Sequence, residues 1–199
     1  MNRKDIIQVP MGENKVLLHT CCAPCSSAII EAMMLNGITP VIYYCNPNIY
    51  PFEEYEIRKN ECTRYAESLG LEIVDADYDH ENWLTAVKGM ENEPERGGRC
   101  LKCFKLRLLR TAEYARQRGI KVITTTLASS RWKSLDQINE AGLWACRQIS
   151  DASPDGPVVW WDRNWRKGGL QERRLQIIKE YDFYNQLYCG CEFSMRKED

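Results

Sequence analysis

Seven cysteines, gathered in three short groups, are the residues of this chain best suited to metal or redox chemistry. They are Cys21, Cys22 and Cys25, then Cys100 and Cys103, then Cys189 and Cys191. Thiolates bind zinc and iron–sulfur clusters, and a Cys-x-x-Cys pair lets one turn of chain supply two of them. Seven thiols exceed the four ligands that one tetrahedral zinc ion or one cubane cluster takes. The surplus predicts one cluster with a second metal or a redox-active thiol pair beside it.

The first group falls between a predicted strand at 15–19 and a predicted helix at 26–35. Ligands of open α/β sheets bind at the carboxyl ends of the strands, and a helix N-terminus lowers the pKa of a nearby thiol. The alternative is that these cysteines only fill the core, but adjacent thiols flanking a proline at the end of a strand fill a core poorly. We therefore expect Cys21 and Cys25 to be catalytic. His19, directly before them, is either a proton donor or a core histidine.

Three kinds of site fit these thiols. An iron–sulfur centre fits groups that lie at strand ends across the whole chain, as the parts of a catalytic centre do. A structural zinc site more often shows two closed Cys-x-x-Cys knuckles. A thiol–disulfide relay is the third alternative. Of the other cysteines, Cys62 and Cys146 lie on apolar helix faces and are predicted to be structural, whereas Cys45 ends a strand and could face the site.

Strand-like and helix-like segments alternate along the chain, which is the pattern of a parallel sheet covered by helices. The predicted strands are 15–19, 40–44, 71–76, 121–127 and 158–161. The predicted helices are 26–35, 52–69, 80–90, 100–118, 134–149 and 170–181. We expect one domain over residues 1–199, of the α/β class, with a mostly parallel five-stranded sheet and helices on both faces.

The composition is that of an ordinary globular protein, with 44% hydrophobic and 28% charged residues. No apolar run approaches the length that spans a bilayer, and the N-terminal residues show no signal-peptide pattern. We therefore expect a cytoplasmic protein with no membrane partner, in which ten cysteines indicate metal or redox chemistry instead of disulfides. The net charge of −1 does not by itself predict a nucleic-acid partner, but it is compatible with a local basic patch.

Two stretches after the fourth and fifth strands combine basic and aromatic side chains. They are Arg131-Trp132-Lys133 and 161–169, which includes Arg166 and Lys167. Proteins stack single-stranded RNA bases on aromatic or arginine planes and hold the phosphates with basic side chains. The alternative is a solvated basic face whose tryptophans complete the core. Two arginines of the glycine-rich loop, Arg96 and Arg99, could bind RNA or pair with neighbouring glutamates.

Most of these residues fall in five short motifs. They are His-x-Cys-Cys-Ala-Pro-Cys at 19–25; Tyr-x-Asn-Pro-Asn-Ile at 44–49, followed by Glu53, Glu54, Tyr55 and Arg58; Glu-Arg-Gly-x-Arg-Cys-x-x-Cys-Phe at 95–104, followed by Arg107 and Leu108; Thr-Thr-Leu at 125–127; and Tyr-Cys-Gly-Cys-x-Phe-Ser at 188–194. Each is weak alone. Together, and in this order, they make the chain resemble the cobalamin-independent epoxyqueuosine reductases, the QueH family, over nearly its whole length.

The resemblance implies an enzyme that reduces the epoxide of epoxyqueuosine in tRNA to the cyclopentene of queuosine. It also implies a [4Fe–4S] cluster with an adjacent mononuclear iron, carried by a nucleotide-hydrolase-like (HUP-like) three-layer sandwich. The partners would be tRNA carrying epoxyqueuosine in its anticodon loop and an external low-potential electron donor. Many members carry Asp where this chain has Cys25, so a thiolate would replace that carboxylate at the second metal.

On this basis each functional residue has an expected role. The cluster would be held by Cys22, Cys100, Cys103 and one of Cys189 and Cys191. Cys21, Cys25 and the remaining cysteine would hold the second metal, whose open position would bind the epoxide oxygen as a Lewis acid. The residues expected to contact the substrate are Tyr44, Asn46, Asn48, Arg96, Arg99, Arg131, Trp132, Arg166 and Lys167.

Two other function classes fit parts of the sequence. A nucleotide-dependent enzyme that transfers sulfur to tRNA would have the same type of sheet. It normally needs a glycine-rich phosphate loop after the first strand, where this chain has the cysteines of 21–25. A zinc-stabilised RNA-binding module without catalysis would be colourless, whereas an iron–sulfur protein purified without oxygen is brown.

Overall fold

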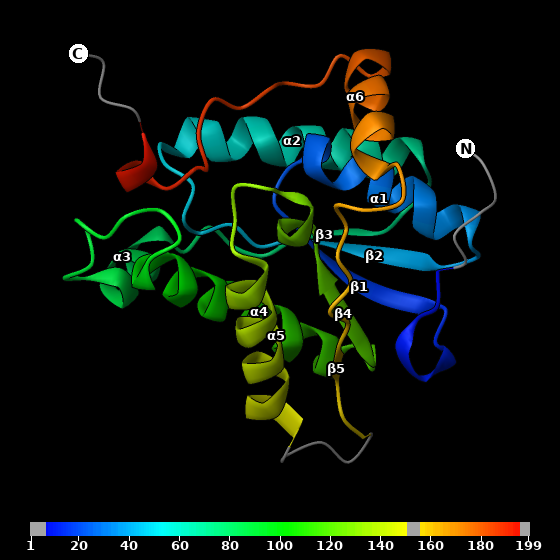
Figure 1. Cartoon of the computed structure of the whole chain (residues 1–199), viewed down its shortest axis with the longest axis horizontal. Helices are drawn as coiled ribbons and strands as arrows, with labels where there is room; N and C mark the ends of the chain where they lie inside the picture. The colour runs from blue at the N-terminus through cyan, green and yellow to red at the C-terminus, as the bar shows by residue number, and fades with distance from the viewer. Residues whose placement is uncertain (1–6, 151–155, 196–199) are drawn as a thin grey trace.

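Five parallel strands form the central sheet of the computed structural model, which describes residues 7–150 and 156–195 (Figure 1). The strands are β1 (Lys15–Thr20), β2 (Thr39–Tyr44), β3 (Ile73–Asp75), β4 (Val122–Thr125) and β5 (Val159–Trp160). Their order in the sheet is β3-β2-β1-β4-β5, and every pairing is parallel. The predicted α/β class with a five-stranded sheet is confirmed, and the arrangement is consistent with a nucleotide-hydrolase-like fold.

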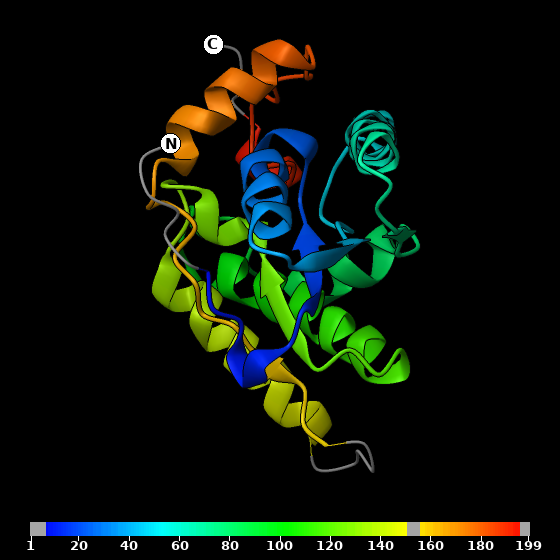
Figure 2. The ribbon, with the colours of Figure 1, turned by 90° about the vertical axis from the view of Figure 1, so that its right-hand side faces the viewer.

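Helices cover both faces of this sheet, which gives three layers (Figures 1 and 2). One face carries α1 (Ala23–Leu35), α2 (Phe52–Ser68) and α6 (Leu170–Glu180), and the other carries α3 (His80–Val87), α4 (Gly98–Gln117) and α5 (Leu135–Ser150). Helices α1 and α6 pack together on the first face, and α4 packs along α5 on the second. Within the described ranges, none of the helices is long and apolar enough to cross a membrane.

Strand β1 lies at the centre because it can be buried on every side. Its residues Val16, Leu17 and Leu18 are completely buried, as expected for a strand covered by helices on both faces. The chain runs outward from β1 to β3 and then returns to the other side of β1 at β4, where Leu17 lies opposite Ile123. The carboxyl ends of β1 and β4 therefore form a topological switch point, where ligands of such sheets bind.

Some strands end at other residues than the sequence predicts, for local reasons. Strands β3 and β5 are shorter than predicted, because each pairs with one neighbour only. Strand β4 ends at Thr125 instead of continuing to residue 127, because a 3₁₀ turn at Thr126–Ser129 follows it and Thr125 Oγ1 accepts a hydrogen bond from the Leu127 N–H (3.1 Å). This turn directs the following loop back toward the end of β1.

Candidate metal centre

The thiols of the first group lie together at the carboxyl end of β1. The Sγ atoms of Cys21, Cys22 and Cys25 are all within 4.8 Å of one another, and those of Cys21 and Cys22 are 3.8 Å apart. Cys22 is the N-cap residue of α1 and Cys25 lies three residues further on, so both side chains fall on one face of the first turn. A tetrahedral ion with metal–sulfur bonds of about 2.3 Å has sulfur–sulfur edges of about 3.8 Å. These donors fit one thiolate-bound metal ion.

Hydrogen bonds distribute the protons of this trio unevenly. Bonds from the thiols of Cys22 and then Cys25 hold the pKa of Cys21 well below its usual range. Donation to Cys21 in turn raises the pKa of Cys25 to about 12. Thr126, which follows β4, also donates its hydroxyl to Cys21 Sγ (3.3 Å) and accepts from the Cys21 N–H (3.1 Å). The first negative charge of the trio therefore lies on Cys21, at the switch point between β1 and β4.

A cavity of about 1030 Å³ opens beside the trio. The thiol-bearing residues in its wall are Cys25, Cys100, Cys103, Cys189 and Cys191. Because Cys25 belongs to the trio, three groups that are far apart in the sequence meet at one place. The cysteines expected to be structural, Cys62 and Cys146, are buried in the core.

The start of α4 presents the second group. The helix begins at Gly98, whose N–H donates to Glu93 Oε2 (2.7 Å). A Cβ on the preceding Gly97 would lie 2.9 Å from the main-chain oxygen of Pro94, closer than Cβ atoms normally come, so glycine suits this close approach. This start places Cys100 and Cys103 in the first two turns of the helix.

The third group is held by its own backbone. The carbonyl of Gly190 accepts a hydrogen bond from the Tyr50 N–H (2.8 Å), and Arg58 donates to the carbonyl of Cys189 (3.2 Å). Gly190 has φ 116, and a Cβ there would lie 2.9 Å from Ile49 Cγ1. The glycine between the two cysteines therefore lets the C-terminal segment press against the loop after β2.

Basic side chains surround the thiols. Those that line the cavity are Arg96, Arg99, Arg107, Arg131, Lys133, Arg166 and Arg174. Glu95 is the only carboxylate among the described residues of its wall. The Nη1 of buried Arg107 lies 3.9 Å from Cys103 Sγ. The cavity is therefore strongly cationic although the whole chain has a net charge of −1.

Lys133 is the cation most closely coupled to the thiols. Burial alone would lower its pKa, but the thiols of Cys189, Cys21 and Cys25 raise it, so the ammonium stays charged. A fixed positive charge beside several thiols favours their thiolate forms, which are the forms that bind metal.

Comparison with known proteins identifies one family. The family model described as epoxyqueuosine reductase QueH matches residues 16–197. The chain belongs to the epoxyqueuosine reductase QueH family. A QueH protein from Histophilus somni is 50% identical over 190 residues, which cover 96% of this chain and 76% of the relative. A QueH protein from Haemophilus influenzae is 48% identical over 193 residues (97% and 76%), and one from Thermotoga maritima is 34% identical over 183 residues (90% of each).

The matched QueH range contains all three cysteine groups, but not every residue expected to contact a substrate lies in the cavity wall. Tyr44 is completely buried, and its hydroxyl donates to the Tyr55 carbonyl (3.2 Å). Asn46 is also buried, donates to the Thr20 carbonyl (2.9 Å) and accepts from Arg107. These two residues fasten the end of β2 to its neighbours, so a substrate could reach them only if the core opened.

Asn48 and Trp132 do lie in the wall. Asn48 is buried, and its Oδ1 has no hydrogen-bond partner among the described residues. The side chain of Trp132 is 68% exposed at the rim, with the guanidinium of Arg131 over its ring at 5.3 Å. These side chains have surfaces or atoms free for a ligand, which fits the roles expected of them in a QueH protein.

The arginines of the glycine-rich loop hold the protein's own main chain. Arg96 donates to the carbonyls of Arg131 (2.8 Å) and Trp132 (2.9 Å). Arg99 donates to the carbonyls of Met90, Glu91 and Glu93 at 2.6–3.1 Å. Neither pairs with the carboxylate of Glu93 or Glu95 in the part of the chain that the structure describes. Both line the cavity, but their hydrogen bonds first shape the loops around it.

Only part of the stretch at 161–169 faces the cavity. Arg166 lies in the wall and donates to the Lys133 carbonyl (2.7 Å), whereas Lys167 is exposed outside it. Trp161 and Trp165 are buried in the core. Apart from Arg166, this stretch therefore matches the alternative considered for it, a solvated basic face whose tryptophans complete the core.

His19 makes the contacts of a core histidine. Its Nδ1 lies 2.7 Å from Thr125 Oγ1 and its Nε2 3.0 Å from the Cys45 carbonyl, so Nε2 carries the proton. Burial, followed by the charge of Arg107, lowers the pKa of His19 to about 3. The imidazole is therefore neutral at pH 7 and both its nitrogens are in use, which matches the second of the two alternatives predicted for it.

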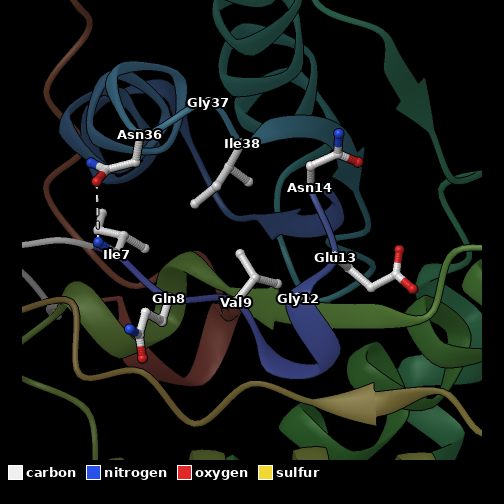
Figure 3. A pocket seen from close by; sticks show the side chains of 9 residues that line it. All are labelled: Ile7, Gln8, Val9, Gly12, Glu13, Asn14, Asn36, Gly37 and Ile38. Atoms are coloured by element: carbon white, nitrogen blue, oxygen red, sulfur yellow. Dashed lines mark hydrogen bonds between the residues drawn. The ribbon is translucent and has the colours of Figure 1, made fainter.

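A second hollow, of about 530 Å³, lies elsewhere on the molecule, at the amino ends of β1 and β2 (Figure 3). Asn36 Oδ1 accepts a hydrogen bond from the Ile7 N–H there (3.1 Å). Glu13 is the only charged residue in its described lining, and no thiol lies among those residues. This hollow offers none of the chemistry of the thiol cavity.

Proposed function

We propose that this member of the QueH family reduces the epoxide of epoxyqueuosine in tRNA to the alkene of queuosine. The observation that carries the proposal is the convergence of three cysteine groups on one cationic cavity. Removal of an epoxide oxygen takes two electrons and two protons, which calls for a redox cofactor. An RNA substrate calls for positive charge around the site. The cavity combines thiols able to bind such a cofactor with positive charge, and the family match supports the substrate.

The donor set supports a division of the thiols between two metal sites. The short sulfur–sulfur distances of Cys21, Cys22 and Cys25 fit a single iron. The four remaining thiols, Cys100, Cys103, Cys189 and Cys191, match the number that a [4Fe–4S] cluster takes. Compared with the assignment expected from the sequence, this division places Cys22 at the mononuclear site and both Cys189 and Cys191 at the cluster. When bound, the cluster would supply electrons from an external low-potential donor, and the adjacent iron would polarise the epoxide oxygen as a Lewis acid.

The chain's own residues would prepare the site in three ways. Arg107 and Lys133 would balance the negative charge of the thiolates. The exposed ring of Trp132 would stack on a base of the anticodon loop, and Arg131 beside it would hold a phosphate. The buried amide oxygen of Asn48 would accept a hydrogen bond from the substrate deeper in the cavity.

The test is anaerobic reconstitution followed by metal analysis and turnover. The protein should be brown, contain more than the four irons of one cubane cluster, and convert epoxyqueuosine to queuosine in tRNA, as measured by nucleoside mass spectrometry. Cys25→Ser should lose about one iron and keep the paramagnetic signal of the reduced cluster, whereas Cys103→Ser should lose that signal. A colourless zinc protein, or full iron and full turnover in both variants, would overturn the proposal.

A further inference from the structure

Trp83 has a polar atom that its surroundings leave unpaired. It is completely buried (0% exposed), and it lies in the wall of the thiol cavity. Its indole Nε1 has no hydrogen-bond partner among the residues that the structure describes. Buried indole N–H groups usually find an acceptor, because burying a donor without one is unfavourable. An orphan donor in a native interior therefore calls for an explanation, such as an ion or cofactor that completes it.

Two other buried tryptophans, Trp160 and Trp165, do have acceptors. The Nε1 of Trp165, which is equally buried, donates to Thr124 Oγ1 (3.3 Å). The Nε1 of Trp160 donates to Asn139 Oδ1 (3.2 Å). The missing acceptor is thus a property of the place where Trp83 lies and not of the way this chain buries tryptophan.

Two of the cavity's thiols, those of Cys103 and Cys191, lie beside Trp83. Trp83 forms a small apolar cluster with Val87, Cys103 and Cys191, separate from the main core. Its ring is stacked with that of His80 at 5.5 Å and with that of Phe193 at 6.1 Å. These contacts fix the ring, so the N–H cannot turn away to find another acceptor.

Metal binding would change what these sulfurs can accept. A protonated thiol is a weak acceptor, whereas a thiolate or a cluster sulfide carries negative charge and accepts a stronger, charge-assisted hydrogen bond. Hydrogen bonds to the sulfurs are one of the factors that set the reduction potential of an iron–sulfur cluster. A donor stabilises the reduced state more, because that state has the larger negative charge.

We propose that the Trp83 N–H donates a hydrogen bond to a sulfur of the metal centre held by Cys103 and Cys191, and thereby raises its reduction potential. The inference rests on the proposed function, because it needs a cluster in the cavity. It assigns Trp83 a role in setting the electron affinity of the site, in addition to filling space beside α4.

The test compares Trp83→Phe with Trp165→Phe in the full-length protein, reconstituted without oxygen. Each variant loses an indole N–H from a fully buried site, but only Trp83 lies beside the thiols. In a redox titration followed by electron paramagnetic resonance, Trp83→Phe should make reduction about tenfold less favourable, a shift of about −59 mV for one electron. Trp165→Phe should leave the potential unchanged.

Thermal unfolding of the metal-free variants distinguishes an effect of Trp83 on the reduction potential from an effect on the stability of the fold. Trp83→Phe removes an N–H that has no acceptor in the metal-free protein, whereas Trp165→Phe removes the hydrogen bond to Thr124. The melting temperature of the Trp83→Phe variant should therefore fall less than that of the Trp165→Phe variant. If phenylalanine reduces iron loading, benzothienylalanine at position 83 keeps the two-ring shape without the N–H and should give the same shift in potential. An unchanged potential at full iron loading overturns the inference alone. A wild-type protein that forms no cluster overturns the proposed function with it.

Discussion

The guanidinium of Arg58 donates a hydrogen bond to the main-chain carbonyl of Cys189, 3.2 Å away and 131 residues later in the chain. A second donation goes to the Tyr188 carbonyl (3.3 Å), and the carboxylate of Glu54 lies 2.6 Å from the same buried guanidinium. The Tyr184 hydroxyl donates to Glu54 as well (2.8 Å). A buried ion pair on α2 thus fixes the segment that brings the last two thiols to the cavity.

Replacement of Arg58 by Gln should release this segment. The substitution removes the donors to the segment and leaves Glu54 buried without its partner, which typically costs about 3–5 kcal/mol. We expect a large loss of stability in urea denaturation and less iron per chain after reconstitution. In the double variant Glu54→Gln/Arg58→Gln the unpaired charge is gone, so stability should partly return while iron stays low. Full iron in the single variant would show that the ion pair does not position Cys189.

Cys21 should be the first thiol of its group to react with an alkylating reagent. Hydrogen bonds from Cys22 and Cys25 lower its pKa, and the thiolate is the reactive form. In metal-free protein at pH 7, mass spectrometry should find iodoacetamide on Cys21 before the other two. Cys22→Ala removes the strongest of these bonds, so the alkylation rate of Cys21 at pH 7 should fall by about tenfold for each pH unit that its titration midpoint rises. Preferential labelling of Cys25 would contradict this order.

The buried imidazole of His19 should make the protein sensitive to mild acid. Its pKa is about 3 in the folded chain, because of burial and the charge of Arg107, and about 6.5 when unfolded. Between these values only the unfolded chain binds the proton, so the free energy of unfolding should fall as the pH falls, by about 1.4 kcal/mol per pH unit. Urea denaturation between pH 5.5 and 4.5, well below the unfolded pKa, should show this slope, and His19→Gln should reduce it. Equal slopes would mean that His19 is protonated in the native protein.

Local patterns were sufficient to predict the centre of the fold. The apolar run of β1, the junction with α1 that carries Cys21 to Cys25, and the first turns of α4 each depend on neighbouring residues, although α1 begins at Ala23 and not at residue 26. The residue types and spacing of a few positions therefore predict them. The alternation of strands and helices predicts a parallel sheet, but the order that brings the end of β1 beside the end of β4 is seen only in the structure.

Side-chain partners from distant segments could not be predicted in this way. Tyr44 and Asn46 belong to a motif, but the sequence does not show that the end of β2 and the loop after it bury both side chains in the core. Lys133 was only one residue of a basic stretch, and its importance comes from thiols on other elements. Nothing in the sequence indicates a role for Trp83, because an unpaired N–H can be recognised only when the positions of all neighbouring residues are known.

The rim of the cavity provides the sharpest test of RNA binding, because two adjacent residues there should act by different physical means. Arg131→Gln removes a positive charge, so it should weaken tRNA binding and reduce the slope of log affinity against log salt by about 0.7, the value for one phosphate contact on a single strand.

Trp132→Ala removes a stacking surface that is 68% exposed. It should cost about 1–3 kcal/mol of binding free energy and leave the salt slope unchanged, since no counterion is released by stacking. Lys179→Gln, on the exposed side of α6 and outside the cavity wall, is the matched control and should change neither quantity. Equal salt slopes for Arg131→Gln and the wild type would place the RNA backbone away from this rim.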